Sequence, residues 1–121
     1  MALRGSVALL AALVMCSGAL AESFHFMPAP SQELSRIYRV DRLTGEMGAC
    51  AFALKDENSV GLTLCYPAGE GAKAGEPGDY MLVASNHRIE AGIFRVNRRT
   101  GDVSVCYVRG DQEIVCSPAA R

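Results

Sequence analysis

Short apolar runs alternate with turn-forming residues over most of this chain. Runs of four to eight residues that are rich in valine, isoleucine and aromatic residues are typical of β-strands. They predict eight extended pieces, at 24–27, 36–41, 46–53, 60–66, 80–84, 92–97, 102–108 and 113–117. No stretch has the 3.6-residue apolar period of a long helix. The pattern therefore predicts an all-β protein.

The second four runs repeat the first four at an offset of 56 residues. The segment "RIYRVDRLTGEMGAC" (36–50) aligns without a gap with "GIFRVNRRTGDVSVC" (92–106), and "TLCYPA" aligns with "IVCSPA" after a shift of five residues. We therefore expect two tandem antiparallel meanders, at about 22–68 and 79–120, that arose by internal duplication. A flexible glycine-rich loop at 69–78 would join them.

The repeated segment contains the chemistry of a hairpin turn. The side chains of Asp41 and Asn97 can each accept a hydrogen bond from a backbone N–H two residues on. Gly45 and Gly101 can take the left-handed conformation that a residue with a Cβ resists. Strand-forming residues flank both turns, as a hairpin loop requires. We interpret the two segments as structural turns rather than functional loops.

Counting outward from the turns predicts the disulfides. The midpoint between Cys50 and Cys65 falls between Glu57 and Asn58, inside the turn-like "KDENS", and Cys106 and Cys116 are equidistant from Asp111. In each hairpin the two cysteines would lie directly opposite each other. Opposed Cα atoms of antiparallel strands are roughly 4.5–5.5 Å apart, which a disulfide tolerates. We therefore predict two structural disulfides, each within one repeat.

The D-x-x-T-G turn at Asp41–Gly45 resembles the hairpins of β-propeller blades and of hairpin repeats in small uncharacterised exported proteins of Gram-negative bacteria. The resemblance covers about 15 residues in each copy, and the second copy has Asn97 in place of the aspartate. Two blades cannot close a propeller, which takes about four or more. The expected fold is therefore a small disulfide-linked sandwich of two sheets, or one continuous twisted sheet.

The N-terminal residues have the pattern of a secretory signal peptide at 1–21. A single arginine precedes an apolar run at 7–16, and Ala19 and Ala21 form an A-x-A cleavage site. The run is too short to span a bilayer comfortably, so no stable membrane insertion is expected. Cleavage would leave one domain, 22–121, in the periplasm or secreted. Four of the five cysteines would remain, an even number that suits an oxidising compartment.

Charge and composition disfavour several classes of function. The formal net charge of −1 offers no global positive field that would attract nucleic acid. The chain has two histidines, His25 and His87, and its cysteines are expected to be bonded, so no nucleophile with an adjacent base is evident. We expect a protein that is not an enzyme and binds no cofactor.

A metal site is the main alternative. His25 and Met27 form a His-x-Met pair near the mature N-terminus, and such a pair can bind copper(I). The two side chains would share one face of a strand. Met81 is the repeat equivalent of His25 and could add a ligand if the two positions are neighbours. Methionines flanked by apolar residues more often pack in a core.

Four arginines gather around the second hairpin: Arg88, Arg95, Arg98 and Arg99. Strand alternation places Arg39 and Arg95 opposite Tyr38 and Phe94, so the arginines would be exposed if the aromatic face forms the core. Such a patch could bind an anionic partner. Arginines on exposed strands also keep sheet edges soluble, which is the structural alternative.

The preferred interpretation is an exported, non-enzymatic binding or structural module of the cell envelope. Its partner would be another envelope protein or an anionic surface polymer, and a homodimer is a further option. The alternative is a small periplasmic protein that handles copper or another metal through His25, Met27 and Met81.

Overall fold

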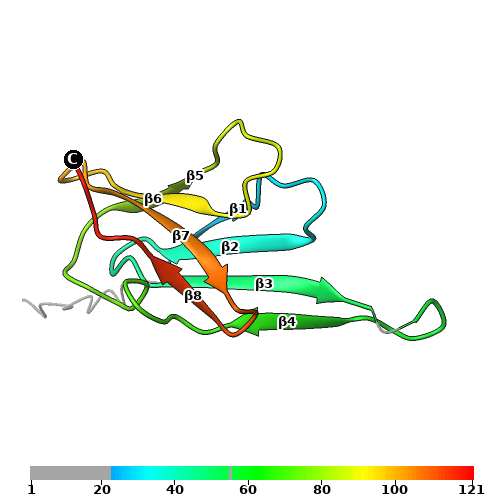
Figure 1. Cartoon of the computed structure of the whole chain (residues 1–121). Helices are drawn as coiled ribbons and strands as arrows, with labels where there is room; N and C mark the ends of the chain where they lie inside the picture. Colours follow the sequence, from blue (N-terminus) through cyan, green and yellow to red (C-terminus); the bar gives the residue numbers. More distant parts are fainter. Residues whose placement is uncertain (1–22, 55) are drawn as a thin grey trace, which may run out of the picture.

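The computed structural model describes residues 23–54 and 56–121 and has eight strands and no helix in this part of the chain (Figure 1). Sheet 1 consists, in order, of β1 (Phe24–Pro28), β2 (Arg36–Asp41), β3 (Met47–Ala53) and β4 (Leu62–Tyr66). Sheet 2 consists of β5 (Tyr80–Val83), β6 (Ile93–Asn97), β7 (Val103–Arg109) and β8 (Glu113–Cys116). All neighbouring strands are antiparallel. The predicted all-β fold of two meanders is confirmed. The expected signal peptide lies outside the described residues.

The two sheets have the same strand order, and their first three strands have the same register at the 56-residue offset. Ile37 pairs with Cys50 between β2 and β3, and Ile93 pairs with Cys106 between β6 and β7. Residues 56 positions apart are therefore called equivalent below. That the sheets arose by duplication stays a prediction.

Side-chain hydrogen bonds close both predicted turns. The Asp41 carboxylate accepts a hydrogen bond from the N–H of Leu43 at 2.8 Å. The Asn97 side-chain oxygen accepts one from the N–H of Arg99 at 3.1 Å. These are the bonds by which aspartate and asparagine start a turn, so local chemistry explains why the chain reverses at both places.

Replacement of Gly45 by valine is expected to destabilise the protein more than the same change at Gly101. The φ angles of the two glycines are 75° and 77°, so a β-branched residue is strained at both. An added Cβ at Gly45 would also lie 2.8 Å from the Tyr80 ring, whereas nothing lies within 4 Å at Gly101. We expect losses in the free energy of unfolding of about 3 kcal/mol for Gly45→Val and about 1–2 kcal/mol for Gly101→Val. Urea denaturation measures both, and equal losses would contradict a role for the Tyr80 contact.

Each sheet carries one disulfide between directly opposed cysteines. Cys50 is bonded to Cys65 and Cys106 to Cys116, with Cα–Cα distances of 4.0 and 4.1 Å. This is the pairing that counting from the turns predicts. The environments differ, because Cys106 and Cys116 are buried whereas Cys65 is exposed.

The two sheets pack face to face and form a sandwich (Figure 1). The alternative of one continuous sheet is therefore wrong. The largest side chains of the shared core are Tyr38, Val40 and Met47 from sheet 1, with Leu82, Ile93 and Ile114 from sheet 2.

The sheets use opposite sides to form this core. Tyr38 is 0% exposed, but its equivalent Phe94 is 37% exposed. Conversely, Ile37 is 42% exposed and its equivalent Ile93 is 0% exposed. The aromatic side is therefore buried in sheet 1 and exposed in sheet 2.

Each sheet has two sides. We call the side that carries Tyr38 in sheet 1, and the side that carries Phe94 in sheet 2, the A face. The side with Ile37 or Ile93 is the B face. The A face of sheet 1 packs on the B face of sheet 2, so the two sheets are stacked in the same sense. A two-fold arrangement would instead bring like faces together.

The segment between the sheets, 69–78, is held in place rather than flexible, contrary to expectation. Gly69 donates its N–H to the carbonyl of Ile114 at 2.7 Å, and Cys116 donates its N–H to the carbonyl of Glu70 at 2.9 Å. Later residues of the segment donate to carbonyls of the first hairpin turn. The segment therefore covers the edge of β8 that would otherwise be free.

Candidate functional site: two exposed apolar faces

Two sheet faces have no sheet packed against them within the described residues: the B face of sheet 1 and the A face of sheet 2, where only Val115 is buried. The first carries Phe24, Phe26, Ile37, Phe52 and the Cys50–Cys65 disulfide. The second carries Val83, Phe94, Val103 and Tyr107. An antiparallel sheet commonly has one polar, solvated face. Here both faces of both sheets are largely apolar, and large exposed apolar patches mark interaction sites.

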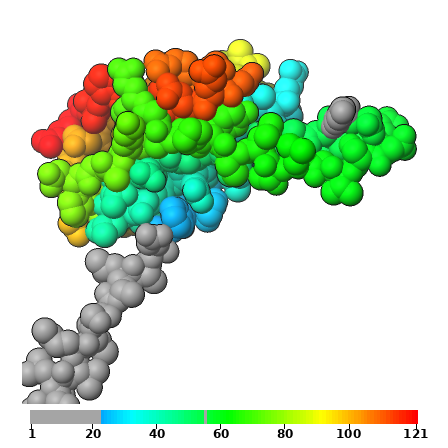
Figure 2. Space-filling view, turned by 90° about the horizontal axis from the view of Figure 1, so that it is seen from below, coloured from blue at the N-terminus to red at the C-terminus, as the bar shows by residue number. Residues whose placement is uncertain are grey.

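The exposed apolar surface of sheet 1 continues onto an arm. The end of β3 and the start of β4 project beyond sheet 2, as the space-filling view shows (Figure 2). Phe52 is 58% exposed there, and Leu62 and Leu64 on the other side of the arm are also exposed. Sheet 2 does not reach these residues, so the arm presents apolar side chains on both sides.

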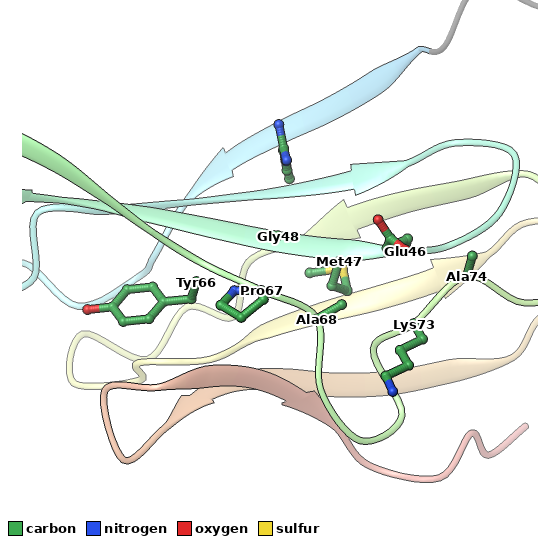
Figure 3. Close-up of a pocket in the computed structure, with 9 residues that line it drawn as sticks. Glu46, Met47, Gly48, Tyr66, Pro67, Ala68, Lys73 and Ala74 are labelled. Atoms are coloured by element: carbon green, nitrogen blue, oxygen red, sulfur yellow. The ribbon is translucent and has the colours of Figure 1, made fainter.

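A groove of about 450 Å³ opens where β4 ends and the chain leaves sheet 1 (Figure 3). Its lining residues are Arg39, Glu46, Met47, Gly48, Tyr66, Pro67, Ala68, Lys73 and Ala74. The Arg39 side chain passes over Gly48, where an added Cβ would lie 2.7 Å from its Nε. The lining offers two cations, one carboxylate and the phenol of Tyr66. The groove can therefore bind a polar group.

The predicted arginine patch is not assembled. Arg88, Arg98 and Arg99 are exposed, and Arg98 lies 3.6 Å from the carboxylate of Asp79. Arg95 points into the contact between the sheets, since it lies on the B face of sheet 2. Arg95 is half-buried, so it does not join the three exposed arginines in one continuous patch.

Arg95 joins the two sheets. Its Nη1 donates to the carbonyl of Gly45 at 2.8 Å, and its Nη2 donates to the carbonyl of Gly71 at 2.9 Å. Its Nε donates to Ser104 Oγ at 3.2 Å, and its guanidinium lies 6.0 Å from the centre of the Tyr80 ring. Burial lowers the pKa of Arg95 from its ordinary value. The sequence did not indicate this role, because the acceptors are backbone carbonyls of the first hairpin turn and of the linker, which are distant from Arg95 in the sequence.

The residues of the metal hypothesis do not converge. His25 and Met27 lie on the A face of sheet 1, toward the core, whereas Met81 lies on the outward A face of sheet 2. The Nδ1 atom of His25 accepts a hydrogen bond from the N–H of Leu82 at 2.9 Å. Among residues 23–54 and 56–121, no three or more His, Cys, Asp or Glu residues are grouped as a metal site.

The side chains with a shifted pKa take part in packing or in surface ion pairs. Burial raises the pKa of Tyr38, whose hydroxyl donates to the carbonyl of Ala91. A hydrogen bond from Arg121 lowers the pKa of Asp102, and the two side chains lie 2.7 Å apart on the surface. Neither pair lines the groove. These shifts therefore reflect packing and surface ion pairing.

No protein-family model, curated protein or solved structure matches this chain. Its resemblance to D-x-x-T-G hairpin repeats therefore stays a prediction.

Proposed function

We propose that this protein is an exported, non-enzymatic binding or structural module of the cell envelope that acts by protein–protein contact. The observation that carries this proposal is the pair of unpartnered apolar faces, with Phe26, Ile37 and Phe52 on sheet 1 and Phe94 and Tyr107 on sheet 2. Aromatic and aliphatic side chains grouped in this way are typical of surfaces that bury against another protein.

Two features support export. Disulfides persist in oxidising compartments, and the described chain has two, both between strands of its fold. In the same residues, no helix is long and apolar enough to cross a membrane. Together with the leader pattern at 1–21, these features favour the periplasm or the extracellular space.

The geometry favours a protein partner over an anionic polymer. An anionic polymer would need a continuous set of exposed cations. Arg95, the central member of the predicted patch, instead donates to backbone carbonyls between the sheets. The two free faces carry exposed apolar side chains instead.

Site-specific photo-crosslinking tests this function. Phe52 and Tyr107 are each replaced by p-benzoylphenylalanine in cells of the native host, and the envelope fraction is irradiated. We expect a protein adduct from both positions. Ile89 is the control position, because it is 79% exposed but lies in the loop between β5 and β6, away from both faces. The absence of any protein adduct from both faces, or equal adducts from Ile89, would contradict the proposal.

A further inference from the structure

We propose that the partner covering the two apolar faces is a second copy of this chain, stacked head to tail. The B face of sheet 1 in one copy would lie on the A face of sheet 2 in the next. This inference rests on the proposed function and names its partner. It follows from the way in which the two sheets of one chain already pack.

The contact inside the chain provides the template. There the B face of sheet 2 covers the A face of sheet 1. Two faces stay free: the B face of sheet 1 and the A face of sheet 2. Their residues are equivalent to residues that pack against each other in the core. A second copy can therefore repeat the internal contact at either end.

The polar contacts between the two sheets of one chain involve one hairpin tip. Tyr80 and Arg95, both on the B face of sheet 2, enclose the tip of the first hairpin at Gly45. The Tyr80 ring lies 2.8 Å from where a Gly45 Cβ would be, and Arg95 Nη1 lies 2.8 Å from the Gly45 carbonyl oxygen. An aromatic ring and an arginine thus hold one hairpin tip of the neighbouring sheet.

The same aromatic–arginine pair is present on the free B face of sheet 1. Phe24 and Arg39 are the equivalents of Tyr80 and Arg95, and the Arg39 guanidinium lies 5.0 Å from the centre of the Phe24 ring. The matching hairpin tip, between β6 and β7 of sheet 2, is free, since nothing lies within 4 Å of an added Cβ at Gly101. In the stack, Phe24 and Arg39 of one copy would enclose Gly101 of the next.

The apolar residues of the free faces are also equivalent to residues that pack in the core. Phe26 and Ile37 are the equivalents of the core residues Leu82 and Ile93, and Phe94 is the equivalent of Tyr38. Each is exposed in the single chain. Stacking would place Phe26 and Ile37 against the face that carries Phe94, and would bury all three.

A head-to-tail contact uses two different surfaces, so its repetition either closes a ring or continues as a fibre. Four-stranded sheets that stack face to face close into rings of about four to eight sheets. Since each chain supplies two sheets, a ring of about two to four copies is expected.

Two charge substitutions separate this arrangement from every like-to-like dimer. Phe94→Glu blocks the A face of sheet 2, and Ile37→Glu blocks the B face of sheet 1. Light scattering after size-exclusion chromatography of the oxidised mature chain should show an oligomer for the wild type and for the control Ile89→Glu. Each blocked variant alone should be monomeric. Their 1:1 mixture should form a heterodimer, because each supplies the face that the other lacks.

Other results would overturn the stacking. The stacking would be contradicted if the wild type stayed monomeric at about 0.5 mM, because this protein concentration lies far above the dissociation constants of stable assemblies. Self-association of either blocked variant alone would show a like-to-like contact. Both substituted side chains are exposed, so far-ultraviolet circular dichroism should confirm an unchanged fold.

Arg39 provides a second, independent test. Arg39→Met should weaken self-association at least about tenfold, because it removes a charged donor from the hairpin tip of the next copy. Arg39→Lys should recover part of the loss. Arg42→Met is the matched control, because Arg42 is also exposed on sheet 1 but lies in its turn. An unchanged dissociation constant for Arg39→Met would contradict the role of this residue in the contact.

The crosslinking experiment distinguishes failure of the stacking from failure of the proposed function. An adduct of twice the chain mass, with peptides of this chain only, supports both. An adduct with a different envelope protein overturns the stacking and leaves the binding function standing. A monomeric wild type without any adduct overturns both.

Discussion

Loss of the Cys106–Cys116 disulfide is expected to lower the free energy of unfolding by about 4 kcal/mol. The bond closes a segment with a sequence separation of 10, which corresponds to about 3 kcal/mol of chain entropy. Both cysteines are also buried in the core. Their replacement by alanine would leave unfilled space, which adds about 1 kcal/mol. Urea denaturation of the Cys106→Ala/Cys116→Ala variant measures the loss.

The Cys50→Ala/Cys65→Ala variant is the matched control. Its sequence separation of 15 gives a similar entropic contribution of about 3 kcal/mol. Cys65 is exposed, so its loss leaves no core cavity. The sheet 1 variant should therefore lose less stability than the sheet 2 variant. A larger loss for the sheet 1 variant would show that burial does not decide the difference.

Replacement of Arg95 by methionine is expected to cost about 3 kcal/mol of unfolding free energy. Methionine fills most of the side-chain volume but leaves the carbonyls of Gly45 and Gly71 without their charged donor. Hydrogen bonds to charged groups contribute about 1.5–3 kcal/mol each, and their contributions are not additive here because they share one guanidinium. Thermal denaturation at two protein concentrations separates this loss from any effect on assembly.

Two further variants give the Arg95 experiment its controls. Arg95→Lys should lose an intermediate amount, since one ammonium group cannot reach both carbonyls with the geometry of a guanidinium. Arg98→Met should change stability by less than about 0.5 kcal/mol, because the Arg98–Asp79 pair is exposed. If Arg95→Met matched Arg98→Met, the contact between the sheets would not depend on Arg95.

The parts of the fold that were predicted from sequence depend on local chemistry. Asp41 and Gly45 determine where the first hairpin turns, and Asn97 and Gly101 do the same for the second. Once the turns are known, the register follows by counting, and the register places the bonded cysteines opposite each other.

The buried face of sheet 2 could not be predicted, because β6 buries its more polar side. Phe94 and Val96 face one way, and Ile93 faces the other with Arg95 and Asn97. The polar residues suggested an outward side. In the structure they face inward, because the carbonyls of sheet 1 and the linker satisfy Arg95 and the N–H of Asp79 lies 3.3 Å from the Asn97 side-chain oxygen. Partners this distant in sequence leave no local pattern.

The hydrogen bonds between the linker and β8 have a consequence for the order of folding. The hairpins of sheet 1 involve only neighbouring segments, so they can close as soon as residues 24–66 have emerged from the ribosome. Gly69 and Glu70 must wait for the carbonyl of Ile114 and the N–H of Cys116, which lie in the last strand. The hydrogen bonds between the linker and β8 therefore form only after the last strand has been synthesised. Until then, the part of sheet 1 that contacts β8 is uncovered.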